Sequence, residues 1–131
     1  MAKFLILYAA CAIIFFPLDF IWLSTMGKTF YQKELGSLLL PNPNLLIAGL
    51  FYLAYLVGVV LLVAAPAEGD VLKALLYGAV LGFVAYGTYD LTNLSTVNGF
   101  TPAVAAVDMA WGTALTAVSA AGGVWIARFF A

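Results

Sequence analysis

Four long apolar segments constrain the fold of this chain more than any other feature. They cover residues 4–26, 44–65, 71–93 and 102–130, and each reaches the roughly 20 apolar residues that a helix needs to cross a bilayer. Only 8% of the residues are charged, whereas a soluble domain carries about 25%, so lipid must replace water around most of the chain. The sequence therefore predicts an all-α fold, a four-transmembrane-helix bundle with short loops, forming a single domain over residues 1–131.

The polar residues, glycines and prolines between the apolar segments predict where the helices begin and end. The first segment follows Lys3 and continues to about Met26, which is too long for the apolar part of a signal peptide, so we expect a retained helix. Residues 27–43 are predicted to form a polar-flanked loop that contains a short helix lying in the membrane interface. Thr101 followed by Pro102 is typical of a helix N-cap with proline at the first helical position.

The basic residues indicate the orientation of the bundle. Four crossings put both chain ends on one side of the membrane. That side collects Lys3, Lys73 and Arg128, and the other side collects Lys28 and Lys33. The positive-inside rule therefore predicts cytoplasmic termini.

Small residues indicate which helices pack most closely. Helices in lipid associate through small side chains that let their backbones approach. Ala74, Gly78 and Gly82 recur every four residues in the third segment, and the fourth segment is rich in glycine and alanine. The third and fourth helices are therefore expected to form the centre, while the second helix faces lipid.

The composition excludes several kinds of chemistry. One cysteine rules out a disulfide framework, and the absence of histidine rules out His-based zinc and haem sites, so we predict no cofactor and no metal site. A metal ion, if bound at all, would have to be a hard ion with oxygen ligands. The net charge of −1, without a basic cluster, argues against a nucleic-acid partner.

Three aspartates lie inside the apolar segments, where each costs roughly 2.5–3.5 kcal/mol at the centre of a span. Asp19 is near the end of the first segment, Asp90 near the end of the third, and Asp108 near the start of the fourth. Because the crossings alternate in direction, these three helix ends lie on the same side, and all three carboxyls fall within ~5–10 Å of them. The sequence therefore predicts one shared site in one leaflet.

The neighbours of the aspartates define a candidate binding pocket that is acidic and aromatic. Residues three apart share a helix face, which gives each carboxyl a hydrogen-bonding neighbour. Three carboxyls crowded in a low dielectric cannot all be ionised, so one or two should be protonated. The candidate residues are Asp19, Trp22, Tyr52, Tyr55, Thr88, Tyr89, Asp90, Asn93, Asp108, Trp111 and Thr113; no catalytic residue is assigned.

A purely structural interpretation of these residues stays open. Asp19 follows Pro17 and could organise the backbone that the proline ring disturbs. Asp90 and Asn93 could act near the end of their helix, and Asp108 could hydrogen-bond a neighbouring helix. The tryptophans and tyrosines could form an interfacial belt.

Several stretches together resemble a bacterial family of small predicted inner-membrane proteins, catalogued as domain of unknown function 2177. The resemblance rests on Asp19-Phe-Ile-Trp22-Leu23, on Phe30-Tyr31 with Leu35-Gly36, on Tyr86-Gly-Thr88-Tyr89-Asp90-Leu-Thr92-Asn93-Leu94 and on Asp108-Met-Ala-Trp111-Gly112-Thr113. It covers essentially the whole chain. It implies a four-helix protein of the bacterial cytoplasmic (inner) membrane and implies no activity.

Three functions are compatible with this sequence. The first is transport, with the acidic site binding a proton, a cation or a small solute, and it would require a homo-oligomer because four helices are few for a transporter. The second is a membrane-embedded enzyme or binding protein for a lipid or another hydrophobic small molecule. The third is an accessory or structural subunit. Membrane lipids are expected partners in every case.

Overall fold

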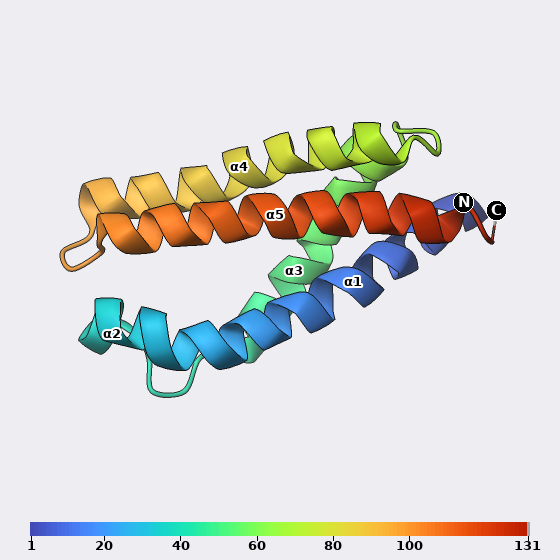
Figure 1. Ribbon diagram of the computed structural model, residues 1–131. Coiled ribbons are helices and arrows are strands. Elements are labelled where there is room, and N and C mark those ends of the chain that lie inside the picture. Colours follow the sequence, from blue (N-terminus) through green and yellow to red (C-terminus); the bar gives the residue numbers. More distant parts are fainter. Residues whose placement is uncertain (131) are drawn as a thin grey trace.

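The computed structural model describes residues 1–130 and is built of helices joined by short connections (Figure 1). In chain order these are α1 (Ala2–Met26), the π-helical η1 (Gly27–Tyr31), α2 (Gln32–Leu35), the 3-10 turn η2 (Gly36–Leu38), α3 (Leu45–Val59), the π-helical η3 (Val60–Ala64), α4 (Val71–Thr96) and α5 (Pro102–Ala127). Within residues 1–130, four segments are long and apolar enough to cross a membrane: Ala2–Leu38, Leu45–Ala64, Val71–Thr96 and Pro102–Ala127. The predicted all-α, four-helix fold is thereby confirmed, and both chain ends lie at the same end of the bundle (Figure 1).

Polar side chains at the helix starts set the beginnings of α3, α4 and α5. The side chains of Asn44, Asp70 and Thr101 each accept a hydrogen bond of 3.1 Å from a backbone N–H three residues later. Such caps satisfy donors that have no partner within the helix. The N-cap predicted at Thr101, with Pro102 directly after it, is confirmed.

The first span extends well beyond the end that the sequence suggests. Gly27 has helical backbone angles, φ −62° and ψ −39°, so α1 runs directly into η1 and α2. Helical structure changes at Gly36, whose φ of +49° suits glycine, and it ends at Leu38. The prediction that the loop begins at residue 27 was therefore wrong, because residues 27–38 are helical. The short helix predicted within this segment is present, but it continues α1. The Thr29 hydroxyl donates to the Thr25 carbonyl oxygen over 2.7 Å, so this polar side chain is satisfied within the helix.

Helices α4 and α5 form the closest pair in the bundle, as predicted. A Cβ atom added to Gly82 would lie 2.5 Å from the Gly112 carbonyl oxygen, and one added to Gly78 would lie 3.0 Å from the Ala117 Cα atom. The missing side chains therefore let the two backbones approach. Helix α1 packs on the other side of α5, where the buried Cys11 meets Gly123.

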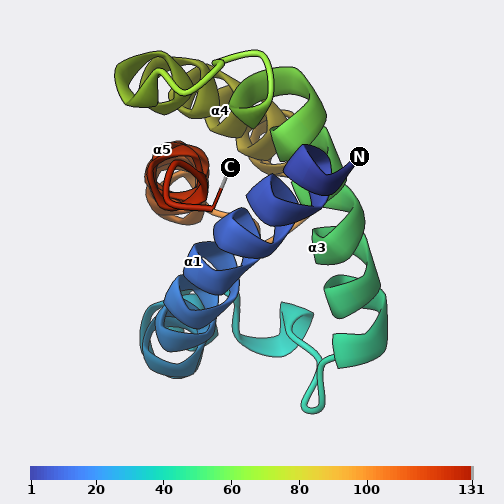
Figure 2. The same cartoon turned by 90° about the vertical axis from the view of Figure 1, so that its right-hand side faces the viewer.

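Helix α3 is the most peripheral of the spans. In the view along the bundle, α1 lies between α5 and α3 (Figure 2). The first half of α3 exposes large apolar side chains such as Leu46, Leu50 and Phe51. Leu56 and Val59 near its end are buried, as is Val60 at the start of η3. This distribution matches the lipid-facing position predicted for the second span.

Candidate functional site

The first part of the site joins α1 to α5 through Asp19. Asp19 is buried, one helical turn before Trp22, and its Oδ1 atom accepts a 3.2 Å hydrogen bond from the Trp111 indole N–H. Tyr52 of α3 lies beside the same carboxyl. Three helices thus converge on Asp19, and a hydrogen-bond donor satisfies one of its oxygens.

The second part of the site is a hydrogen-bond chain that leads to Asp108. The Trp22 indole N–H donates to the Tyr31 hydroxyl over 3.2 Å, and that hydroxyl donates to Asp108 Oδ1 over 2.8 Å. Tyr31 reaches Asp108 because η1 continues the helical path of α1. Asp108, near the start of α5, is half-buried.

Asp90 of α4 differs from the other two aspartates because its carboxyl has no donor. The side chain is fully buried, and neither of its oxygens has a hydrogen-bond partner. Its polar neighbour is the carboxyl of Asp108, within hydrogen-bonding reach. Ionised carboxylates only accept hydrogen bonds, so this pair can form one only when a proton is bound to one of the two groups.

The three aspartates therefore lie on α1, α4 and α5 at the end of the bundle away from the termini, at the depth expected from the sequence. Lys28 and Lys33 are exposed, and the chain's other basic residues, Lys3, Lys73 and Arg128, belong to the opposite end. No fixed positive charge is built into the acidic site.

The structure does not bring all the candidate residues together. Thr88 is exposed, and its hydroxyl donates to the Val84 carbonyl oxygen of its own helix. The Thr113 hydroxyl likewise donates to the Met109 carbonyl oxygen. Each of these hydroxyls is used within its own helix, and neither contributes to the acidic site.

Three other candidates border the acidic site rather than form it. Tyr89 is 61% exposed and packs edge-on against Phe100, and Asn93 is its neighbour on α4. Tyr55 lies nearer the end of the bundle that carries the chain termini, and its hydroxyl is 2.9 Å from the Thr116 hydroxyl. These residues lie near the aspartates without contacting them through a hydrogen bond.

Sequence reasoning missed Tyr31 as part of the site. The sequence places Tyr31 in the predicted loop of residues 27–43 and therefore outside the helices that carry the aspartates. Its position nine residues after Trp22 gives no α-helical signal, because nine residues turn by about 900° and would place the two side chains on opposite faces. Tyr86, which the sequence places at a similar depth, packs against Gly112 of α5 and lies edge-on to Tyr55.

Within residues 1–130, no group of three or more His, Cys, Asp or Glu side chains is arranged to hold a metal ion. A hard cation needs six or more oxygen ligands, or several retained water molecules. In the part of the chain that the structure describes, the three aspartates do not form such an arrangement.

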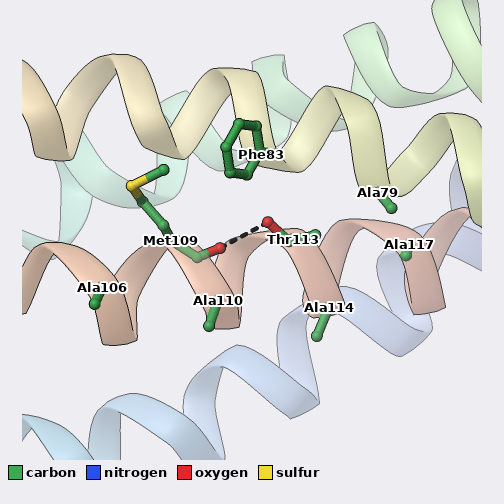
Figure 3. A pocket seen from close by; sticks show the side chains of 8 residues that line it. All are labelled: Ala79, Phe83, Ala106, Met109, Ala110, Thr113, Ala114 and Ala117. Atoms are coloured by element: carbon green, nitrogen blue, oxygen red, sulfur yellow. Dashed lines mark hydrogen bonds between the residues drawn. The ribbon is translucent and has the colours of Figure 1, made fainter.

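An open apolar groove lies elsewhere, between α4 and α5 (Figure 3). It has a volume of about 640 Å³ and is lined by Ala79, Phe83, Ala106, Met109, Ala110, Thr113, Ala114 and Ala117. With 3.6 residues per helical turn, Ala106, Ala110 and Thr113 lie on the side of α5 away from Asp108. The groove and the acidic site are therefore on opposite faces of α5.

A comparison with models of known protein families shows which family this chain belongs to. Residues 4–125 match the model of the family described as "Predicted membrane protein (DUF2177)". The chain belongs to this family. No curated protein and no solved structure matches it. The family description agrees with the four membrane-spanning helices, so this is a multi-pass membrane protein, and the description assigns no activity to the acidic site.

Proposed function

We propose that this protein binds a proton at the Asp90–Asp108 pair and couples that proton to the transport of a small solute or cation across the membrane. The observation that carries the proposal is the Asp90 carboxyl, which is fully buried and lacks any donor for either oxygen. Leaving a buried polar group unsatisfied is costly. A proton on the pair lowers that cost, because one carboxyl then donates to the other.

The surroundings of the pair support proton binding. Intramembrane carboxyls commonly mark proton and ion paths. Tyr31 donates to Asp108 and accepts from Trp22, so the pair is continuous with groups that can rearrange their hydrogen bonds when the proton leaves. Lys28 is exposed and belongs to η1, as Tyr31 does, which supports access to the site from the nearer membrane surface.

A structural or accessory subunit is the second candidate, and the satisfied hydrogen bonds of Asp19 and Asp108 favour it. Trp111 and Tyr31 hold these carboxyls across helix boundaries, as polar residues that fix helix register do. An enzyme or binding protein for a hydrophobic molecule has less support. The apolar groove between α4 and α5 lies on the face of α5 away from the carboxyls that would serve as acid and base.

Infrared spectroscopy of the protein in lipid nanodiscs tests the proton site. We expect a protonated carboxyl at neutral pH that exchanges slowly in D₂O and disappears in Asp90→Asn. Asp70→Asn is the matched control, since Asp70 is exposed and asparagine caps helices equally well. The same spectrum in the wild type and in Asp90→Asn would contradict a proton site at Asp90.

Flux through proteoliposomes then separates transport from the accessory role. Vesicles with an internal pH dye are challenged with Na⁺, K⁺ and a series of organic ammonium ions. Transport predicts solute-driven proton movement in the wild type that Asp90→Asn abolishes. Equal signals from the wild type, Asp90→Asn and empty vesicles, with the protonated carboxyl present, would favour the accessory subunit.

We propose further that the transporter is a homo-oligomer. Ala106, Ala110 and Ala114 recur every four residues on an exposed face of α5, a spacing that lets a second helix approach closely. In a Cys11→Ser background, Ala110→Cys should form disulfide-linked dimers in membranes, whereas Leu50→Cys on the exposed face of α3 should not. Equal cross-linking at both positions would contradict an α5 interface.

The proposed location is the bacterial inner membrane with cytoplasmic termini. Lys3, Lys73 and Arg128 belong to the terminal end of the bundle, and cytoplasmic ends of spans carry an excess of basic residues. A fluorescent-protein fusion at the C-terminus should be fluorescent and an alkaline phosphatase fusion there inactive. The reverse pattern would invert the orientation.

A further inference from the structure

A second cavity lies at the opposite end of the bundle from the acidic site. It has a volume of about 330 Å³ and is lined by Lys3, Leu7, Ala64, Glu68, Gly69, Val124, Ala127 and Arg128. The lining comes from α1, η3, the η3–α4 connection and the end of α5. These segments lie at the end of the bundle that faces the viewer in Figure 2.

The cavity has an apolar base and a charged rim. Leu7, Ala64 and Val124 are buried, whereas Lys3, Glu68 and Arg128 are exposed. Lys3 lies in the first turn of α1, and Arg128 directly follows the last residue of α5. The rim is therefore at the helix ends, and Leu7 and Val124 at the base lie one helical turn farther into the bundle.

The charges on the rim favour an anion. Lys3 and Arg128 contribute two positive charges and Glu68 one negative charge, which leaves +1. Glu68 has a left-handed φ of +50°, and the following Gly69 has a φ of +83°, so a tight turn places this carboxylate at the rim. A singly negative phosphate diester carrying apolar chains matches both the charge of the rim and the apolar base.

We infer that this cavity binds an anionic phospholipid, with the headgroup phosphate between Lys3 and Arg128 and the start of an acyl chain against Leu7 and Val124. Basic pockets between transmembrane helices recognise such headgroups. The site is separate from the Asp90–Asp108 pair and does not depend on its function. Free inorganic phosphate shares the headgroup chemistry but lacks the chains that would fill the base.

Native mass spectrometry of the full chain, released from micelles containing phosphatidylglycerol or phosphatidylcholine, tests the inference. We expect retained phosphatidylglycerol in the wild type and little phosphatidylcholine. In the Lys3→Gln/Arg128→Gln variant, affinity for phosphatidylglycerol should fall by about fivefold for each charge removed, or about 25-fold in total. The matched control is Lys28→Gln/Lys33→Gln, which removes the same charge from the other end and should bind as the wild type does.

Two further variants make the result decisive. Lys3→Arg/Arg128→Lys keeps both charges and should retain the lipid, which separates charge from folding defects. Glu68→Gln should tighten phosphatidylglycerol binding, because it removes the negative charge from the rim. Weaker binding in Glu68→Gln, equal losses in the two double glutamine variants, or displacement of the lipid by millimolar inorganic phosphate would each overturn the inference.

Discussion

The indole rings of Trp22 and Trp111 stack face to face, with their centroids 4.3 Å apart and their planes inclined by 4°. Their N–H groups have different acceptors: that of Trp111 donates to Asp19, and that of Trp22 donates to Tyr31. The stacked pair therefore joins α1 to α5 between two carboxyls. It couples the packing of these helices to the hydrogen bonds of the acidic site.

Trp111→Phe should destabilise the protein by about 1–3 kcal/mol, because it leaves the buried Asp19 carboxyl without its donor while an aromatic ring remains. The free energy of unfolding is measured by titrating dodecyl sulfate into mixed micelles. Trp125→Phe is the control, since Trp125 is 53% exposed and lies edge-on to Phe129. It should change stability by less than ~0.5 kcal/mol. Equal effects of the two changes would contradict the role of the Trp111 N–H.

Tyr31→Phe should loosen the helical extension after Gly27. The change removes the donor to Asp108 and the acceptor of Trp22 together, and a hydrogen bond to a charged group contributes about 1.5–3 kcal/mol. Amide hydrogen exchange in residues 27–38 should accelerate, while α4 keeps its protection. Tyr77→Phe, on an exposed position of α4, should leave the extension unchanged; protection that persists in Tyr31→Phe would show that other contacts hold it.

The spans and the depth of the aspartates could be predicted from the sequence, because both depend only on apolar length and helix direction. The face of its helix on which each side chain lies was harder to predict. Thr88 lies at the depth of Asp90, but Ala74, Gly78, Gly82 and Asp90 lie on one stripe at multiples of four residues. Extending the glycine stripe to Asp90 would have shown that Thr88 faces outward.

The helical extension was missed for a different reason. Gly27 and Lys28 usually indicate the end of a span, whereas this segment stays helical and makes tertiary contacts along its length. The ring of Tyr31 packs at 72° against that of Trp22, and the Thr101 hydroxyl donates to Glu34 over 2.9 Å. These contacts with α1 and α5 could not be inferred from local sequence patterns.

Gly82→Ala should separate α4 from α5. The added Cβ atom would lie 2.5 Å from the Gly112 carbonyl oxygen and 2.9 Å from the Thr116 Cβ atom, and a backbone atom cannot move aside as a flexible side chain can. We expect a loss of about 1–3 kcal/mol in the free energy of unfolding. Gly58→Ala is the control, since nothing lies within 4 Å of its added Cβ, and a loss of similar size there would indicate a general effect of alanine.

Cys11, the single cysteine of the chain, reports on the contact between α1 and α5. It is fully buried against Gly123, so a membrane-permeant maleimide should label the native protein at least ~tenfold more slowly than the unfolded protein, since labelling requires local opening. Gly123→Ala places a methyl group where the Cys11 sulfur lies, which should part the helices and accelerate labelling. Gly49→Ala, where the added Cβ meets nothing within 4 Å, should keep the slow rate. Rapid labelling of the native wild type would contradict the packing of α1 on α5.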